Sequence, residues 1–408
     1  MSELSYLEKL LDGVEVEWLP LGEVSALRRG RVMSKGYLTE NFGPYPVYSS
    51  QTANNGKIGS INTFDFDGEY ISWTTDGANA GTVFYRTGKF SITNVCGLIT
   101  LKSKYSLIYK FLFYWLTIEA KKHVYSGMGN PKLMSHQVEN IPVPIPCPDN
   151  PEKSLAIQSE IVRILDTFSA LTAELTAELT AELNMRKKQY NYYRDQLLSF
   201  NTEDVPHLPM GQKDIGEFIR GGTFQKKDFI DAGVGCIHYG QIYTYYGTYT
   251  EKTKTYISTA LAKKCKKAQK GDLIIATTSE NDEDVCKAVA WLGSEDIAVS
   301  SDACIYKHNL NPKYVSYFFQ TEQFQNQKRQ YITGAKVRRV NADNLSKILI
   351  PVPSMEIQER IVSILDKFDT LTNSITEGLP REIELRQKQY EYYRDLLFSF
   401  PKPETVSN

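Results

Sequence analysis

Apolar residues recur at spacings of three and four in two segments of the chain, which predicts two amphipathic helices. The first stripe consists of Ile157, Ile161, Ile164, Leu165, Phe168 and Leu171. The second segment begins 200 residues later and repeats the pattern. Ser154 and Ser354 follow proline-rich stretches that cannot be helical, so we expect each serine to cap its helix.

These two helices are parts of one duplicated pattern. SLAIQSEIVRILDTFSALT, from Ser154, returns as SMEIQERIVSILDKFDTLT, from Ser354. RKKQYNYYRDQLLSF, from Arg186, returns at the same offset as RQKQYEYYRDLLFSF, from Arg386. The tetrapeptide IPVP precedes each helix, at Ile141 and at Ile350. The chain therefore carries two long helices, each ending in a segment rich in tyrosine and arginine.

The regions before the helices correspond more faintly and predict two strand-rich domains. GEYISWTTDG, from Gly68, parallels GDLIIATTSE, from Gly271, and a second pair of segments places Cys96 opposite Cys304. Alternating and β-branched runs separated by Gly, Asn and Asp are typical of strands and turns. We predict mixed α/β domains at residues 1–150 and 201–353, and helical spacers at residues 151–200 and 354–408.

Two similar domains on two similar helices predict an α+β fold with pseudo-two-fold symmetry. Each apolar stripe needs a partner, and antiparallel packing of the two helices would bury both stripes. Pro380 disturbs this symmetry, because proline inside a helix kinks or breaks it.

Leucine recurs at every fourth residue in the middle of the first spacer, where Thr-Ala-Glu-Leu occurs three times in succession. Its leucines are Leu171, Leu175, Leu179 and Leu183. One tetrad adds roughly 6 Å of helix and roughly 40° beyond a full turn, which is close to the rotation of roughly 35° per base pair of B-DNA. The array therefore predicts a ruler. The alternative is a neutral product of replication slippage in a tolerant helix.

Composition excludes several classes of protein. The net charge is −1, which argues against a self-sufficient nucleic-acid binder. The six cysteines are scattered without a C-x-x-C pair, so neither a disulfide framework nor a cysteine zinc site is expected. No signal peptide or membrane span is apparent, and the cytoplasm is the expected location. P-loop, dinucleotide and adenine-methyltransferase motifs are lacking, and no metal site is expected.

The repeated helix motif, the paired IPVP segments and the tetrad array resemble the specificity subunit of Type I DNA restriction–modification enzymes, over the whole chain. The array is similar to that of the IC subfamily. The resemblance implies a non-catalytic subunit with two target-recognition domains, each reading half of a bipartite DNA target through the major groove, while the helices set the gap. It also implies that two modification subunits and two restriction subunits bind. The cofactors S-adenosylmethionine, ATP and Mg²⁺ are expected on those partners, and none on this chain.

Candidate DNA contacts are polar and basic residues of predicted loops, since such side chains reach bases or phosphates. In the first domain they are Arg28, Arg29, Arg31, Ser49, Ser50, Gln51, Thr75, Asn79, Asn130 and Lys132. In the second domain they are Tyr239, Gln241, Thr278, Asn281, Lys336, Arg338 and Arg339. Tyr48-Ser49-Ser50-Gln51 parallels Tyr239-Gly240-Gln241, which matches Gln51 with Gln241. The loops from Gly127 to Lys132 and from Gly334 to Arg339 are favoured. For every loop the alternative is an ordinary solvated turn.

The near-identical helix ends predict two equivalent partner sites, because tyrosine and arginine anchor interfaces. The candidates are Tyr190, Tyr192, Tyr193, Arg194, Tyr390, Tyr392, Tyr393 and Arg394. The alternative is that these helix ends pack on their own domains. The rival functions are a stand-alone duplicated DNA-binding regulator, an enzyme with a composite site between its halves, and a structural scaffold.

Overall fold

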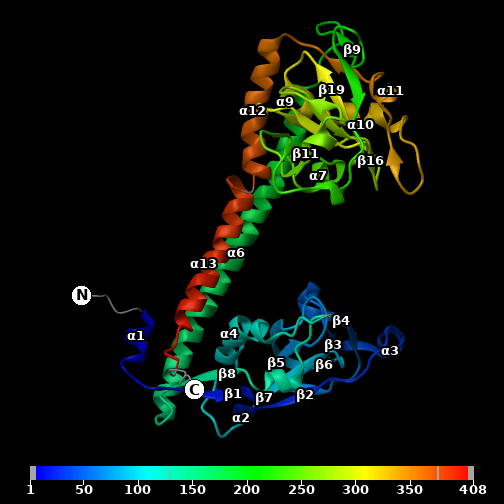
Figure 1. Ribbon diagram of the computed structural model, residues 1–408. Helices are drawn as coiled ribbons and strands as arrows, with labels where there is room; N and C mark the ends of the chain where they lie inside the picture. The colour runs from blue at the N-terminus through cyan, green and yellow to red at the C-terminus, as the bar shows by residue number, and fades with distance from the viewer. Residues whose placement is uncertain (1–5, 128, 375, 403–408) are drawn as a thin grey trace. The chain divides into compact units, whose positions relative to one another are not determined.

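The computed structural model describes residues 6–127, 129–374 and 376–402, and it divides into two compact units (Figure 1). Unit 1 comprises Met1–Thr176 and Leu385–Asn408, and unit 2 comprises Ala177–Glu384. Each unit therefore contains one strand-rich domain and parts of both helical segments. Residues 1–5 and 403–408, at the ends of the predicted domain ranges, and Met128, in a favoured loop, lie outside the described residues.

The domain of unit 1 is a mixed α/β structure. Its elements are α1 (Tyr6–Leu11), β1 (Val16–Pro20), α2 (Leu21–Val24), β2 (Ser25–Arg29), α3 (Lys35–Glu40), β3 (Phe42–Tyr48), η1 (Ala53–Gly56), β4 (Lys57–Ile61), β5 (Phe66–Thr74), β6 (Val83–Ile92), β7 (Cys96–Leu101), α4 (Tyr109–Glu119), η2 (Ala120–His123), α5 (Ser135–Val138) and β8 (Pro142–Pro146).

Six of these strands form one sheet, in the order β2-β7-β5-β6-β3-β4, and β1 pairs with β8 in a separate ribbon. The pairing is antiparallel except between β3 and β6, which run parallel. Helix α4 contacts β5 and β6. Its buried Phe111 and Trp115 share a core with Ile71, Trp73 and Ile99 of the sheet. Burial of these large apolar side chains stabilises the domain.

The domain of unit 2 repeats this plan. Its elements are β9 (His207–Pro209), β10 (Gly216–Arg220), η3 (Lys226–Asp228), β11 (Val234–Ile237), α7 (Tyr239–Thr244), β12 (Tyr249–Thr250), β13 (Thr255–Ile257), α8 (Thr259–Ala262), β14 (Lys267–Ala268), β15 (Leu273–Ala276), β16 (Thr278–Ser279), β17 (Ala288–Trp291), β18 (Ile297–Val299), β19 (Ala303–His308), α9 (Pro312–Phe318), α10 (Glu322–Arg329), β20 (Arg338–Arg339), α11 (Ala342–Leu345) and β21 (Leu349–Pro351).

Strand pairing makes the two domains comparable element by element. β10, β19, β15 and β17 pair in the order of β2, β7, β5 and β6, and β11 pairs parallel with β18 as β3 does with β6. Unit 2 divides the long strand β6 into β17 and β18, so its strands form a five-stranded and a four-stranded sheet. Between them Gly293 lies against the Trp291 ring, where a Cβ would come within 2.3 Å of a ring carbon. The predicted duplication of mixed α/β domains is confirmed.

The two helical segments differ in continuity. The first is one unbroken helix, α6 (Pro151–Leu197), as expected from its alanine, leucine and glutamate content. The second is divided into α12 (Met355–Asn373) and α13 (Gly378–Leu397). Pro380 lies in the first turn of α13, where the helix needs no amide donor from it. The predicted break therefore occurs, and it precedes the proline.

The two predicted serine caps have different outcomes. Ser354 occupies the cap position of α12, although its side chain makes no capping hydrogen bond. Helix α6 begins at Pro151, so Ser154 lies inside it and its predicted capping role is wrong. Asn150 takes that role, because its Oδ1 accepts a hydrogen bond of 3.0 Å from the amide of Lys153.

Each domain is fastened to the start of its following helix by the same polar contact. Asp166 of α6 accepts hydrogen bonds from Lys110 Nζ (2.6 Å) and Tyr114 Oη (2.7 Å). Asp366 of α12 accepts the equivalent bonds from α9, with Lys313 Nζ at 2.7 Å. Charge-assisted bonds of this length fix the helix direction relative to the domain.

In each unit the end of the other helical segment packs against the helix that follows the domain. In unit 1, Ser169 of α6 bonds Tyr390 of α13, while Phe168 stacks on Tyr393 with ring centroids 5.5 Å apart. The contacts run in opposite directions along the two helices, so α6 and α13 are antiparallel in this unit. In unit 2, Phe368 of α12 contacts Tyr193 near the end of α6, at 5.7 Å.

No helix in the described parts of the chain is long and apolar enough to cross a membrane.

Replacing Phe398 by alanine should destabilise unit 1. Phe398 is buried and lies 5.2 Å from Phe111 and 5.8 Å from Trp115, ring centroid to centroid. We expect a loss of about 3 to 5 kcal/mol in the free energy of unfolding, measured by urea titration. Tyr392→Ala, at an exposed site nearby, should change it by less than about 0.5 kcal/mol. Equal stability of both variants would show that the helix end does not belong to the core.

Candidate nucleic-acid interface

Each domain carries a hairpin loop closed by the same backbone pattern. In unit 1, Tyr125 and Lys132 exchange two backbone hydrogen bonds of 2.8 and 3.0 Å. In unit 2, Thr333 and Arg339 exchange two of 2.9 Å. Lys132 and Arg339 therefore occupy equivalent positions. The two loops, which we favoured from the sequence, are counterparts in the structure.

A threonine lies beneath each hairpin. The Thr75 carbonyl accepts from Leu133 N at 2.9 Å, and the Thr277 carbonyl accepts from Val340 N at 3.1 Å. Thr75 is therefore equivalent to Thr277, so the sequence alignment of these strands is displaced by one residue. Thr75 and Thr278 are buried, which contradicts their prediction as DNA contacts.

The same displacement affects the cysteines. Two residues before the equivalent threonines, Trp73 lies opposite Gly97 and Ile275 lies opposite Cys304. Gly97 is thus the counterpart of Cys304, and the predicted pairing of Cys96 with Cys304 is wrong by one residue.

An arginine ends the edge strand at the same place in both domains. Arg29 ends β2 and Arg220 ends β10, and they lie opposite the equivalent residues of β7 and β19. Arg29 Nη2 donates to the carbonyl of Asn94 at 2.8 Å, and Arg220 Nε donates to the carbonyl of Ser301 at 3.2 Å. Each exposed guanidinium is thereby held by one carbonyl of the adjacent turn.

Sequence reasoning missed Arg220, although a signal was present. Both arginines are followed by glycine. A Cβ on Gly30 would come within 2.1 Å of the Ile92 carbonyl oxygen, and one on Gly221 within 2.1 Å of the Ser300 carbonyl oxygen. The close approach of two backbones therefore requires glycine at both places. The shared Arg-Gly dipeptide is the signal.

In unit 2 the arginine and the hairpin line one hollow of about 280 Å³. Its polar lining includes Arg220, Thr277, Ser301, Asp302, Arg339 and Asn341. In unit 1, Arg29 Nη2 lies 3.3 Å from Thr75 Oγ1, and the backbone of Lys132 pairs with that of Asp76 in an isolated antiparallel β-bridge. We call Arg29 with Lys132, and Arg220 with Arg339, the basic notch of each domain.

Five of the predicted DNA contacts have side chains that are available to bind a ligand. The exposed side chains of Arg28, Asn130, Lys132, Lys336 and Arg339 form no hydrogen bond or ion pair within the described residues. Basic and amide groups of this kind can contact either phosphates or base edges.

A second group of predicted contacts is engaged inside the domains. Arg31 forms an ion pair with Asp65 at 3.0 Å, and its bond to Tyr37 raises the pKa of the guanidinium. Arg338 Nε lies 2.7 Å from Asp282. The remaining engaged side chains are those of Ser49 (to Thr93), Ser50 (to the Asp76 carbonyl), Gln51 (to the Lys57 carbonyl) and Asn281 (to Asp284). Asn79 accepts a hydrogen bond from Thr74 through its backbone carbonyl only.

The predicted match between Gln51 and Gln241 is wrong. Tyr48 lies opposite Ile92, and the equivalent pair in unit 2 is Ile237 opposite Val299, which places Gly240 at the position of Gln51. Gln241 is buried: its Oε1 accepts from His238 N at 3.0 Å and its Nε2 donates to Thr255 at 3.0 Å. Half-buried Tyr239 is the first residue of α7, and His238 is the N-cap of that helix.

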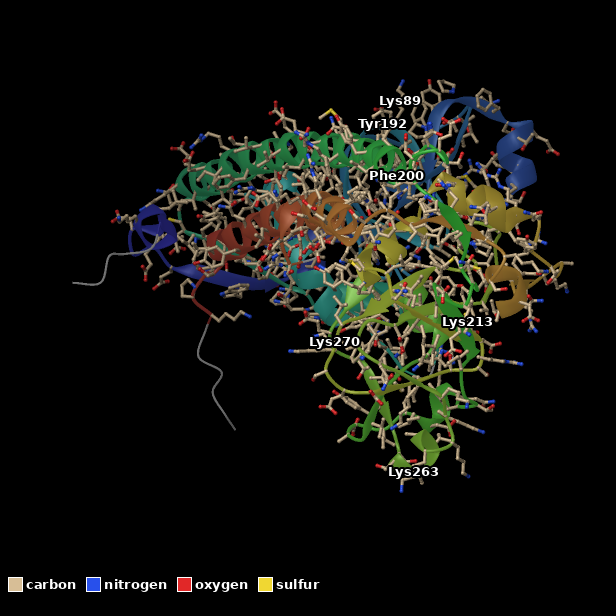
Figure 2. All side chains as sticks on the ribbon, turned by 90° about the horizontal axis from the view of Figure 1, so that it is seen from above. Lys89, Tyr192, Phe200, Lys213, Lys263 and Lys270 are labelled. Carbon is tan, nitrogen blue, oxygen red and sulfur yellow. The ribbon has the colours of Figure 1, made fainter. Side chains whose placement is uncertain are left out.

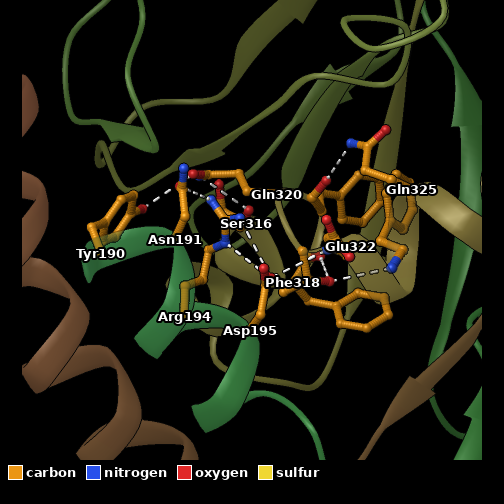
Figure 3. A network of polar contacts seen from close by, with 12 residues as sticks. Tyr190, Asn191, Arg194, Asp195, Ser316, Phe318, Gln320, Glu322 and Gln325 are labelled. Carbon is orange, nitrogen blue, oxygen red and sulfur yellow. Dashed lines mark hydrogen bonds and ion pairs between the residues drawn. The ribbon is translucent and has the colours of Figure 1, made fainter. Parts of the chain in front are cut away.

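The tyrosine-rich helix ends divide into a buried and an exposed set. Figure 3 shows Tyr190 and Arg194 in a polar network with residues of the domain of unit 2. Tyr190 Oη donates to Gln320 Oε1 at 3.1 Å, and Asp195 beside Arg194 accepts from Glu322 N at 3.2 Å. Burial raises the pKa of the Tyr190 phenol. Tyr190 and Arg194 are buried, so their predicted role as partner contacts is wrong.

Two adjacent tyrosines remain exposed at each helix end. The exposed fractions are 60% for Tyr192 and 46% for Tyr193, and 65% for Tyr392 and 38% for Tyr393. Figure 2 shows Tyr192 among the outward side chains of α6. Each pair packs edge to face at 5.4 Å. Tyr390 and Arg394 are half-buried, with Arg394 Nη1 3.4 Å from Thr117 Oγ1.

The helical array is partly exposed as well. Leu171 is 56% exposed, and Leu175, Leu179 and Leu183 are half-buried. In the described ranges no group of three or more metal-binding residues gathers.

Comparison with known proteins assigns the family. The family model of the Type I restriction modification DNA specificity domain matches twice, over residues 13–185 and 209–385. The chain belongs to this family. It is a specificity subunit, the non-catalytic DNA-recognition component of a Type I restriction–modification system.

Two relatives match nearly the full length of the chain. The Type I restriction enzyme EcoR124I/EcoR124II specificity subunit of Escherichia coli is 41% identical over 432 aligned residues, covering 100% of both chains. A putative Type I restriction enzyme specificity subunit of Haemophilus influenzae is 34% identical and covers 97% of this chain and 98% of its own. A chain from a solved Type I restriction–modification assembly, 13% identical, shares the fold with a TM-score of 0.63 over 94% of this chain and 98% of its own.

Proposed function

We propose that the specificity subunit reads a bipartite DNA target, with one half bound by each domain. The observation that carries this proposal is the duplication of the basic notch and its hairpin loop at equivalent positions of two separate domains. Duplex DNA offers a phosphate backbone and base edges, which basic and amide side chains contact. The loops differ in sequence between the domains, which suits two different half-sites.

The unbroken helix α6 supports a second part of the proposal, that the spacer sets the distance between the half-sites. Its 47 residues span about 70 Å. Its first turns belong to unit 1 and its last turns to unit 2. A flexible linker of Gly and Ser would transmit no length, whereas a continuous helix transmits both length and rotation. The tetrad array and its similarity to the IC subfamily belong to this proposal.

The exposed tyrosine pairs support a third part, that two modification subunits bind at equivalent sites. Large aromatic side chains left in solvent mark interfaces more often than other surface residues do. In unit 1 the pair adjoins an apolar hollow of about 390 Å³, lined by Ile164, Phe168, Tyr393, Leu396 and other residues. We assign S-adenosylmethionine to the modification subunits, and ATP and Mg²⁺ to the restriction subunits. We expect both kinds of subunit in the cytoplasm.

A stand-alone DNA-binding regulator is the competing function. The net charge of −1 argues against it, because counterion release from phosphates supplies most of the affinity of an isolated DNA-binding protein. The exposed tyrosine pairs also have no role in that function. Binding partners would supply further positive charge.

Deleting one tetrad, residues 176–179, should shorten the gap between the half-sites by about one base pair, because the deletion removes roughly 40° of rotation beyond a full turn and one base pair turns B-DNA by roughly 35°. The gap is read by mapping methylated sites in DNA from cells that carry the variant and its partner subunits. Thr176→Ala, which keeps the helix length, should leave the gap unchanged. An unaltered gap after the deletion would reject the ruler.

Replacing Tyr192 and Tyr193 together by alanine should weaken assembly with the modification subunit. An interface hot-spot residue contributes about 2 kcal/mol or more, so we expect a loss of at least about thirtyfold in affinity, measured by sedimentation. Lys187→Ala and Lys188→Ala, on the exposed face of the same helix, serve as the matched control. Assembly as tight as that of the unchanged chain would refute the interface.

A further inference from the structure

The duplication allows contacts with the DNA backbone to be separated from contacts with the bases. Phosphate contacts carry no direct sequence information, whereas base contacts do. Side chains that are alike at equivalent, exposed positions of both domains are therefore candidates for phosphate contacts, because every DNA sequence has the same phosphate backbone. Positions at which the two domains carry different chemistry suit the bases.

The basic notch is the feature that both domains share. Arg29 and Arg220 coincide in strand position, in the carbonyl that holds the guanidinium and in the glycine that follows. Lys132 and Arg339 coincide in the backbone pattern of the hairpin, and both are basic and exposed. In unit 2 the two arginines outweigh Asp302, the one acidic residue in the lining of the hollow.

The residues just before Lys132 and Arg339 in the hairpin loops differ between the domains. Counting back from the equivalent residues Lys132 and Arg339, Arg338 corresponds to Pro131, and Val337 corresponds to Asn130. Unit 2 has a guanidinium where unit 1 has a proline, and unit 1 has an amide where unit 2 has an aliphatic side chain. Such differences change hydrogen-bonding capacity, which is the property that distinguishes one base edge from another.

We propose that the basic notch of each domain, Arg29 with Lys132 and Arg220 with Arg339, binds a backbone phosphate of its half-site, and that Asn130 and Arg338 of the hairpin loops contact bases. This inference rests on the proposed function. A guanidinium anchored by one nitrogen retains further donors for a phosphate oxygen. The Asp282 carboxylate that pairs with Arg338 is exposed, so the pair can open on the duplex at small energetic cost.

The test uses the complete complex of this chain with its modification subunits. Its affinity for target DNA, and for DNA with the second half-site scrambled, is measured over a series of salt concentrations, and the methylated motif is mapped in cells. Arg220→Ala should lower the affinity for both DNAs by the same factor and reduce the salt slope by about one. The mapped motif should stay the same.

Three further variants sharpen the test. Arg220→Lys should recover most of the affinity, because a phosphate accepts either cation while bidentate base reading does not. Arg338→Ala should instead relax the motif at one position of the second half-site. Lys213→Ala removes one exposed charge before β10, at the other end of the strand from Arg220, and should change neither quantity (Figure 2).

A relaxed motif with Arg220→Ala would overturn the inference, and so would an unchanged affinity and salt slope. If the unchanged chain still yields a bipartite motif, the proposed function stands even when the inference fails. An unchanged chain that yields a continuous motif would reject the proposed function, and the inference with it.

Discussion

The structure depends on one packing constraint: each recognition domain is held between the start of one helical segment and the end of the other. Asp166 fastens the start of α6 to Lys110 and Tyr114, while the end of α13 buries Phe398 against the same domain. The second domain repeats this arrangement with the start of α12 and the end of α6. A domain fixed by two helices presents its loops in a defined direction, as sequence reading over separated half-sites requires.

The same duplication separates what the fold conserves from what it varies. Strand register, the Arg-Gly dipeptide and the hairpin-closing hydrogen bonds coincide in both domains. Loop side chains, and the division of one long strand into β17 and β18, do not coincide. A rigid common framework with variable loops allows sequence specificity to change without loss of the core, because the loops contribute little to the burial of apolar surface.

The sequence predicted the helices, the two domains and their order, because the apolar periodicity and the 200-residue repeat are strong signals. It failed where a one-residue displacement matters. The β-strands offered no exact repeat, so Cys96 was matched to Cys304 and Gln51 to Gln241, and Arg220 was missed. Burial was also invisible: Tyr190 and Tyr192 have the same chemistry in one motif, yet the helical rotation buries the first and exposes the second. The interruption expected near Pro380 occurs, but it lies between Asn373 and Gly378, and the proline is accommodated in the first turn of α13.

The most direct test of the account is the methylated motif itself. DNA from cells that carry the unchanged chain with its partner subunits would be sequenced by a method that detects methylated adenine. The account predicts two short defined sequences separated by a gap of fixed length, in which any base is accepted. A single continuous motif, or a gap of variable length, would contradict a pair of domains held by one continuous helix.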